Sequence, residues 1–269
     1  MSRNLDKQVV IITGATSGIG QAVARQLAQE GCKLVLAARR QNRLRAIAQE
    51  LEERWGTEIL VQVTDMSQPQ AIEALVAATL EAFGRIDILF SNAGYGDFQA
   101  FSENQPQQVV DMFQVNVFGM MYLSQLVAIQ QLNQASPGQI HLVGSIAGKI
   151  PTAMTSAYAA SKAAIIAYAD ALRLELYETP IQVSTINPGP VKTAFFDHSP
   201  QMLAYAQVVD AFSLEADELA GRIVANMKRK QVKRELNLPW QLAFASKLYH
   251  LCPQVGDFLA ARLFNLKEE

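Results

Sequence analysis

The sequence predicts an α/β protein built on a doubly wound parallel sheet, with helices on both faces in three layers. Short apolar runs alternate along the chain with longer segments whose apolar residues recur every three or four positions. This alternation is typical of parallel strands joined by right-handed crossovers. The first apolar run, residues 9–12, ends in a glycine cluster that leads directly into a helical segment. That order of elements is typical of sheets that bind nucleotides.

The remaining elements follow from the same periodicity. Four branched apolar residues at 9–12 suit a strand buried on both faces. Expected strands cover residues 9–12, 33–38, 58–63, 86–90, 139–143 and 181–186, and expected helices cover residues 21–30, 41–55, 69–83, 106–134 and 157–177. The expected sheet order is 3-2-1-4-5-6-7, with a ligand crossing the carboxyl ends of the strands. We expect residues 1–269 to form one domain, because α/β sheets of this size commonly fold as one unit.

The glycine cluster predicts a site for an anion. Residues 13–20 read Thr-Gly-Ala-Thr-Ser-Gly-Ile-Gly, with glycines spaced GxxxGxG. Glycines let the backbone approach a pyrophosphate, and the helix start offers free N–H groups and a positive dipole end. The alternative is a glycine turn that serves only as a strand–helix connection.

The end of the second strand favours NADP over NAD. An acidic residue about 20 positions beyond the glycines takes the ribose hydroxyls of NAD in such folds. Here Ala38 ends the strand, and Arg39 and Arg40 follow. A guanidinium can hold a 2′-phosphate that a carboxylate would repel. The alternative is that both arginines are solvated residues at a strand end.

Tyr158 and Lys162 lie four residues apart, about one helical turn, so that their side chains share one helix face. An ammonium beside a phenol favours the phenolate, so we expect Lys162 to bring the pKa of Tyr158 towards neutrality. Such a tyrosine can exchange a proton with an alcohol or carbonyl oxygen. Ser145 lies thirteen residues upstream and follows an apolar run, so it could also simply end a strand. Asn116, within an apolar helix, could be only a structural bridge.

In combination, these motifs resemble the short-chain dehydrogenase/reductase family from residue 9 to about residue 193. The residues that carry the resemblance are Thr13–Gly20, Asp65, Ser91–Gly94, Asn116, Ser145, Tyr158, Lys162, and Asn187–Pro190 with Thr193. Ser91 departs from the family, which more often has asparagine there. The resemblance implies a Rossmann-like fold and a homodimer or homotetramer.

The resemblance also implies residue roles. Tyr158 would be the general acid or base, and Lys162 would lower its pKa and bind the nicotinamide ribose. Ser145 would bind the substrate oxygen, and Asn116 would hold a water that links Lys162 to solvent. The implied NADP(H)-binding residues are Gly14, Thr16, Ser17, Gly18, Ile19, Gly20, Arg39, Arg40, Asp65, Met66, Asn92, Ala93, Gly94, Tyr158, Lys162, Pro188, Gly189, Val191 and Thr193.

Composition narrows the class of protein. Half the residues are apolar and 18% are charged, so a large core is expected. A net charge of −2 offers no general attraction to nucleic acid. Two cysteines and three scattered histidines predict neither a disulfide framework nor a metal site. No secretory h-region follows the start, and no run approaches the length that spans a membrane, so we expect a cytoplasmic protein.

Three segments bear on partners and substrate. The helix at 106–134 is apolar nearly all round, which predicts cover by a second subunit or, alternatively, by the C-terminal segment. Residues of about 192–213 resemble the family's substrate flap, where aromatic residues and Met202 would line an apolar pocket. Lys192 and His198 are the only positive residues there that could pair with a carboxylate or phosphate of a substrate. The extension at about 238–269 has helical apolar spacing, broken by Pro253. With the basic cluster at 228–234 it could dock on a membrane, or it could pack in the core or an oligomer.

The sequence therefore predicts an NADP-dependent oxidoreductase that moves a hydride between nicotinamide and a carbonyl or secondary alcohol of a largely apolar small molecule. One alternative is a non-catalytic NADP(H) sensor on the same fold. Another is a peripheral membrane reductase of lipid-like substrates, supported only by the C-terminal extension.

Overall fold

The computed structural model describes residues 3–134, 136–197 and 199–263. Seven parallel strands form the main sheet in the order β3-β2-β1-β4-β5-β6-β9. The strands are β1 (Val9–Thr13), β2 (Lys33–Ala38), β3 (Ile59–Val63), β4 (Ile88–Ser91), β5 (Gly138–Val143), β6 (Ile181–Pro188) and β9 (Glu235–Leu238). The predicted three-layer fold and sheet order are confirmed, with β9 as the seventh strand.

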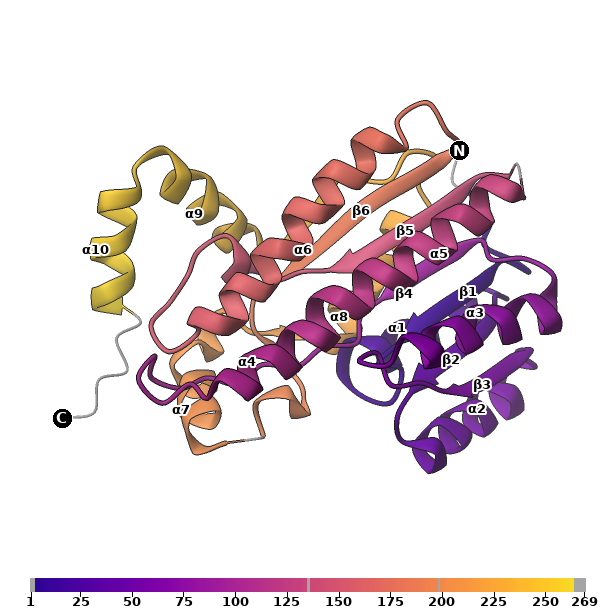
Figure 1. Cartoon of the computed structure of the whole chain (residues 1–269), viewed down its shortest axis with the longest axis horizontal. Helices are drawn as coiled ribbons and strands as arrows, with labels where there is room; N and C mark the ends of the chain where they lie inside the picture. The colour runs from indigo at the N-terminus through magenta and orange to yellow at the C-terminus, as the bar shows by residue number, and fades with distance from the viewer. Residues whose placement is uncertain (1–2, 135, 198, 264–269) are drawn as a thin grey trace.

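Helices cover both faces of this sheet (Figure 1). On one face lie α1 (Gly18–Gln29), α2 (Gln41–Trp55) and α8 (Ala216–Met227), whose buried residues form one core with β1 and β2. On the other lie α3 (Pro69–Phe83), α5 (Met120–Asn133) and α6 (Ser156–Glu175), which form a second core with β4 to β6. Burying apolar side chains on both faces explains why the strands read as continuous apolar runs.

The predicted helix at 106–134 is interrupted. It consists of α4 (Pro106–Phe113), a π-helical turn η1 (Gln114–Gly119) and α5. By length and composition, residues 106–133 could cross a membrane, because an 18-residue window within them has a mean hydropathy of 1.4, so the prediction that no run approaches that length is wrong. Half of that window is buried within the protein, and core helices of non-membrane proteins pass the same test.

Two further segments complete the fold near the carboxyl ends of the strands. The short strands β7 (Val191–Lys192) and β8 (Leu214–Glu215) pair with each other and bracket the flap. The flap contains η3 (Ala194–Phe196), α7 (Pro200–Val208) and η4 (Asp210–Phe212). After β9, the helices α9 (Trp240–Leu251) and α10 (Pro253–Leu263) form a hairpin, called the C-terminal hairpin below.

The C-terminal hairpin projects past the carboxyl end of β6 (Figure 1). It therefore does not provide the cover over α5 that was the alternative to a second subunit. The basic cluster precedes β9, whereas the hairpin follows it, so the two lie at opposite ends of this strand. Lys228 pairs with Glu30 and Arg234 with Asp170, so two charges of the cluster are neutralised within the chain.

Candidate functional site

One cavity of about 920 Å³ opens at the carboxyl ends of the parallel strands. This is the edge at which open α/β sheets bind ligands. Its walls come from the glycine turn, the ends of β2, β4, β5 and β6, the start of α6, the flap and the C-terminal hairpin. All of the sequence-predicted cofactor residues except Gly20 border this cavity, as do Ser145, Tyr158 and Lys162.

Gly20 lies beneath the glycine turn and shapes it. A Cβ at Gly20 would stand 2.4 Å from the main-chain oxygen of Gly14, so no larger residue fits there. Gly14 has φ of +67°, a conformation that side chains disfavour. At the start of α1, the Ser17 side chain makes no capping hydrogen bond, and the first turn carries no acidic residue. The N–H groups of this turn are therefore available to an anion in the cavity.

Asn92 borders the cavity and also supports the glycine turn. Its amide Nδ2 donates to the main-chain oxygen of Thr13 over 3.1 Å. In return, the Thr13 hydroxyl accepts from the N–H groups of Asn92 and Ala93, at 2.9 and 3.0 Å. These bonds tie the end of β4 to the end of β1. Sequence reasoning placed Thr13 in the glycine motif but assigned it no role, because nothing in the sequence indicates its contact with Asn92.

Three arginines stand where β2 ends. The Arg40 guanidinium donates to the Thr16 hydroxyl over 2.9 Å and so joins this strand end to the glycine turn. Arg39 is exposed, borders the cavity and makes no side-chain hydrogen bond within the described residues. Arg43, on the first turn of α2, also borders the cavity and was not anticipated. The three guanidiniums give this end of the cavity a positive charge.

The opposite side of this end is formed by residues after β3. Asp65 borders the cavity, and its Oδ1 accepts hydrogen bonds from the N–H and hydroxyl of Ser67 at 2.9 and 2.8 Å. These bonds fix the carboxylate and leave Oδ2 for a ligand. Met66, the next residue, also borders the cavity and is 5% exposed.

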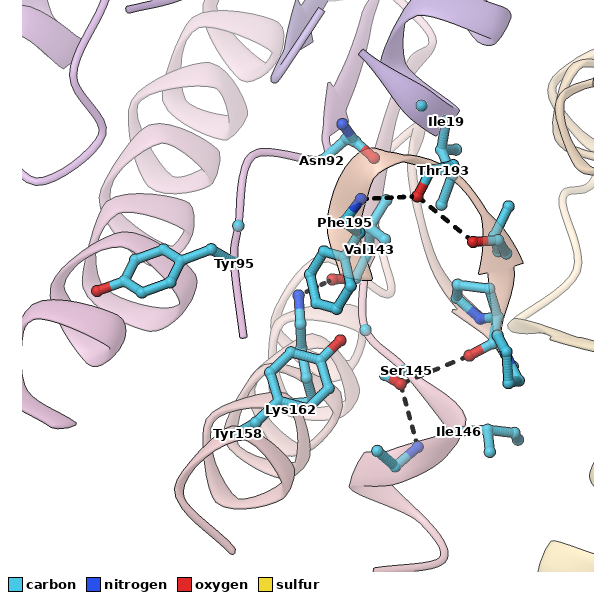
Figure 2. Close-up of a pocket in the computed structure, with 18 of the residues that line it drawn as sticks. Ile19, Asn92, Tyr95, Val143, Ser145, Ile146, Tyr158, Lys162, Thr193 and Phe195 are labelled. Carbon is cyan, nitrogen blue, oxygen red and sulfur yellow. Dashed lines mark hydrogen bonds between the residues drawn. The ribbon is translucent and has the colours of Figure 1, made fainter. Parts of the chain in front are cut away.

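Ser145, Tyr158 and Lys162 gather in the middle of the cavity (Figure 2). Tyr158 and Lys162 project from the same face of α6, and the phenol points toward Ser145. The Ser145 hydroxyl accepts from the N–H of Ala147 over 3.1 Å, as the cap of a short 3₁₀ turn, η2 (Ile146–Gly148). Ser145 thus follows the end of strand β5, caps the next turn and also faces the phenol, which is compatible with both the structural and the functional interpretation.

The expected effect of Lys162 on Tyr158 is not what the structure shows. Burial raises the pKa of Tyr158 to about 12, although its hydrogen bond with Ser145 acts in the opposite direction. Burial also lowers the pKa of Lys162 to about 8. The Lys162 ammonium donates to the Val143 carbonyl at 3.0 Å and lies 5.8 Å from the centre of the Tyr158 ring. Its charge therefore does not overcome the desolvation of the phenol.

Asn116 lies in the π-helical turn η1 and is fully buried. Its Oδ1 accepts from the Tyr95 N–H at 3.0 Å, and its Nδ2 donates to the Tyr95 carbonyl at 2.8 Å. A Cβ at Gly94 would stand 2.9 Å from the Asn116 Oδ1 and 3.3 Å from the Lys162 Nζ. Asn116 is thus a structural bridge to the Tyr95 loop. Because Gly94 has no side chain, a small space remains between Asn116 and Lys162.

The segment after β6, which the sequence predicts to hold the nicotinamide, closes one end of the cavity. Pro188, Gly189, Val191 and Thr193 all border it. The Thr193 hydroxyl accepts from the N–H of Phe195 at 3.3 Å and so starts the flap.

Aromatic side chains of the flap pack over the phenol. The ring of Phe195 lies 5.9 Å from that of Tyr158, and Phe98, which was not anticipated, lies 5.4 Å from it. These rings and those of Phe196 and Tyr205 border the cavity. Met202 is 1% exposed and packs beneath this cluster, so the prediction that it lines the pocket is wrong.

Of the two positive candidates of the flap, one is paired within the chain and the other cannot be placed. Lys192 forms an ion pair with Glu215 at 3.0 Å, and His198 lies outside the described residues.

Comparisons with known proteins show which family this chain resembles in sequence and structure. A family model described as short chain dehydrogenase matches residues 8–204. An uncharacterized oxidoreductase from Staphylococcus saprophyticus is 35% identical over 189 residues, which cover 70% of this chain and 80% of that protein. A short-chain dehydrogenase/reductase from Burkholderia phymatum, solved in complex with NAD, superposes with a TM-score of 0.85 at 27% identity, over 94% of this chain and 96% of that chain.

A second solved structure binds the other nucleotide. L-sorbose reductase from Gluconobacter frateurii, complexed with NADPH and L-sorbose, superposes with a TM-score of 0.80 at 27% identity, over 88% of this chain and 97% of that chain. The likeness alone therefore selects neither NAD nor NADP. The family match includes the glycine turn, Ser145, Tyr158, Lys162 and six of the seven sheet strands. This chain is accordingly an oxidoreductase of the short-chain dehydrogenase/reductase family.

Proposed function

We propose that the protein is an NADPH-preferring reductase of carbonyl groups on largely apolar small molecules. The observation that carries this proposal is the meeting of the Ser145 and Tyr158 side chains in a cavity that has arginines at one end and apolar side chains at the other. Proteins that only sense a nucleotide have no need for a buried phenol beside a hydroxyl.

The cavity fits a nicotinamide dinucleotide. The open first turn of α1 suits its pyrophosphate, and the free Oδ2 of Asp65 suits the adenine amino group. Arg39, with Arg40 and Arg43 beside it, suits a 2′-phosphate, and no acidic residue stands at the end of β2 to prefer free ribose hydroxyls. When bound, this cofactor supplies or accepts the hydride.

The protein groups provide the proton. Because its pKa is about 12, the Tyr158 phenol stays protonated near neutral pH, which suits a proton donor to the substrate oxygen during reduction. The Ser145 hydroxyl would donate a hydrogen bond to the same oxygen as negative charge develops there. Lys162 would bind the nicotinamide ribose, and the space beside Gly94 would take the water that links it to Asn116.

A panel of carbonyl compounds tests the proposal. The rate of NADPH oxidation, followed by absorbance, is expected to give a higher kcat/KM for aromatic and alkyl ketones and aldehydes than for small keto acids and sugars. A preference for the charged or sugar set would contradict the apolar substrate but not the reaction. Tight NADPH binding without consumption by any carbonyl would instead favour the nucleotide sensor.

The proposal includes a homodimer and a cytoplasmic location. Phe118, Ile129 and Leu132 are 43–53% exposed on the outer face of η1 and α5, beside a groove of about 510 Å³. Cover of this groove by a second subunit would remove apolar surface from water.

One observation favours a second candidate, the membrane-associated reductase. Trp240, Phe244 and Leu251 form an exposed apolar stripe on α9. Co-flotation of the protein with liposomes, lost in Trp240→Ser, would support this candidate, and absence of flotation would remove it.

A further inference from the structure

The cavity does not end at the catalytic residues but continues between the protein body and the C-terminal hairpin. On α9, Gln241, Leu242, Ala245, Leu248, Tyr249 and Cys252 border it. These positions recur every three to four residues, so one continuous face of the helix lines the cavity over about 16 Å. From α10, Val255, Gly256 and Ala260 extend the same wall. We call this part of the cavity the distal limb.

The distal limb is joined directly to the reaction site. The segment that follows Ser145 provides its other wall, through Ile146, Ala147 and Ile150. Near the nicotinamide end, α9 packs closely on the protein body, because a Cβ at Gly189 would stand 2.6 Å from the Leu242 side chain. A molecule with its carbonyl between Ser145 and Tyr158 can therefore extend along α9 without leaving the cavity.

The hairpin is fixed in the arrangement that forms the limb. Gly256 lies under the ring of Tyr249, where a Cβ would stand 2.3 Å from the ring. The Tyr249 hydroxyl donates to the Asp257 carboxylate at 2.7 Å. This bond engages the hydroxyl outside the limb, so that Tyr249 presents its ring to the cavity.

The chemistry of the lining selects the ligand. The charged residues that border the cavity are Arg39, Arg40, Arg43, Asp65 and Lys162, all of them at the cofactor and catalytic end. Among the described residues, the distal limb is lined by aliphatic and small side chains, one aromatic ring and the amide of Gln241, which lies at its inner end. A long, uncharged limb of this kind suits an unbranched hydrocarbon chain better than a polar group.

We propose that the distal limb binds the alkyl chain of a long-chain aldehyde or ketone, so that α9 and α10 set the chain-length preference of the enzyme. This proposal rests on the reductase function proposed above and names its substrate class.

A chain-length series with a matched pair of variants tests it. We would measure kcat/KM with NADPH for straight-chain aldehydes from butanal to dodecanal. Each added methylene is expected to raise kcat/KM about two- to fourfold until the limb is full. Ala245→Leu narrows the limb and should lower the ratio of kcat/KM for dodecanal to that for butanal by about tenfold. Ala243→Leu makes the same change in the same helix, away from the lining, and should leave this ratio unchanged.

A binding measurement separates the failure of this proposal from that of the reductase function. Calorimetry on the NADP⁺-loaded protein should show tighter binding of 1-decanol than of 1-butanol, and Ala245→Leu should reduce the difference. A kcat/KM that does not rise with chain length would overturn the proposal while the reductase function stands. Equal effects of the two alanine variants would overturn it as well. Absence of turnover for every carbonyl would refute the reductase function, and the alcohol affinities would still decide whether the limb binds chains.

Discussion

Lys162 donates its hydrogen bond to the main-chain oxygen of Val143, 3.0 Å away, at the carboxyl end of β5. Ser145 lies two residues beyond Val143. The same strand end therefore positions both the ammonium and the serine hydroxyl, while α6 carries the phenol between them. The relative placement of these three side chains depends on how α6 docks against β5. If they act as proposed, their substitution should have separable effects on chemistry and on cofactor binding.

Tyr158→Phe should abolish turnover and leave NADPH binding nearly unchanged. The substitution removes the proton donor but keeps the ring that packs on Phe98 and Phe195. Steady-state kinetics and titration of NADPH fluorescence would measure the two effects. Tyr177→Phe, at an 81% exposed tyrosine, serves as the control. Substantial activity in Tyr158→Phe would refute the assigned proton donor.

Lys162→Ala should lower kcat and also weaken NADPH binding, because its amine would contact the cofactor ribose while lying beside the phenol. The same two assays apply. Lys247→Ala, at an exposed position of α9 that does not border the cavity, should change neither quantity. An unchanged NADPH affinity in Lys162→Ala would exclude contact of the amine with the ribose.

Arg39→Ala should remove most of the preference for NADPH over NADH. A hydrogen bond to a charged group contributes about 1.5–3 kcal/mol, which corresponds to a preference of about 10- to 100-fold in kcat/KM. Arg40→Ala should weaken both cofactors, because Arg40 also supports Thr16 in the glycine turn. Arg45→Ala, on an exposed part of α2 away from the cavity, is the control. If Arg39→Ala leaves the ratio unchanged, its guanidinium is only a surface charge.

The protein should sediment as a homodimer or a larger oligomer at micromolar concentration. Ile129→Glu should shift it toward the monomer, because it places a charge on the exposed face of α5. Leu251→Glu makes the same kind of change on the C-terminal hairpin and should leave the assembly intact. A monomeric wild-type protein in sedimentation velocity would contradict this prediction.

His141 should make the protein less stable in acid. It is fully buried, its Nε2 lies 3.0 Å from the Gln139 Oε1, and burial lowers its pKa to about 3. In the unfolded chain its pKa is about 6.5. Between about pH 6.5 and pH 3 the imidazole is protonated in the unfolded state but neutral in the folded state. Over this range His141 therefore lowers the free energy of unfolding by about 1.4 kcal/mol for each pH unit that the pH falls.

Denaturant unfolding at a series of pH values would measure this dependence. His141→Gln replaces the imidazole with a neutral amide next to Gln139 and should flatten the pH dependence between about pH 6.5 and 4. His250→Gln, at an exposed position of α9, should not. An equal slope in wild type and His141→Gln would show that other groups cause the acid instability.

Sequence reasoning predicted the fold well where local chemistry marks the boundaries. The bounds of α2 and α3 agree with the structure because glycines in the left-handed conformation, Gly56 and Gly84, end them. The π-helical turn around Asn116 could not be predicted, because the helix is apolar on most sides and an extra residue per turn leaves its hydrophobic pattern unchanged. The seventh strand at 235–238 is only four residues long and alternates weakly, so it gave no clear signal.

The candidate site shows a similar division. Motif residues of the glycine turn, Ser145 and Tyr158 could be predicted to lie at one cavity because their order and spacing are distinctive. The pKa of Tyr158 could not, since it depends on burial by Phe98 and Phe195 from distant segments. The contribution of α9 to the cavity was also missed, because an apolar helix face looks the same in sequence whether it lines a core, an oligomer interface or a binding site.

The bonds between Asn92 and Thr13 bear on how the cofactor binds. They hold the ends of β1 and β4 in place through contacts within the protein itself. The chain entropy of this edge is therefore lost when the protein folds and not when the nucleotide binds. A nucleotide arriving at the glycine turn meets a preorganised surface, and its affinity is not reduced by the need to order that surface.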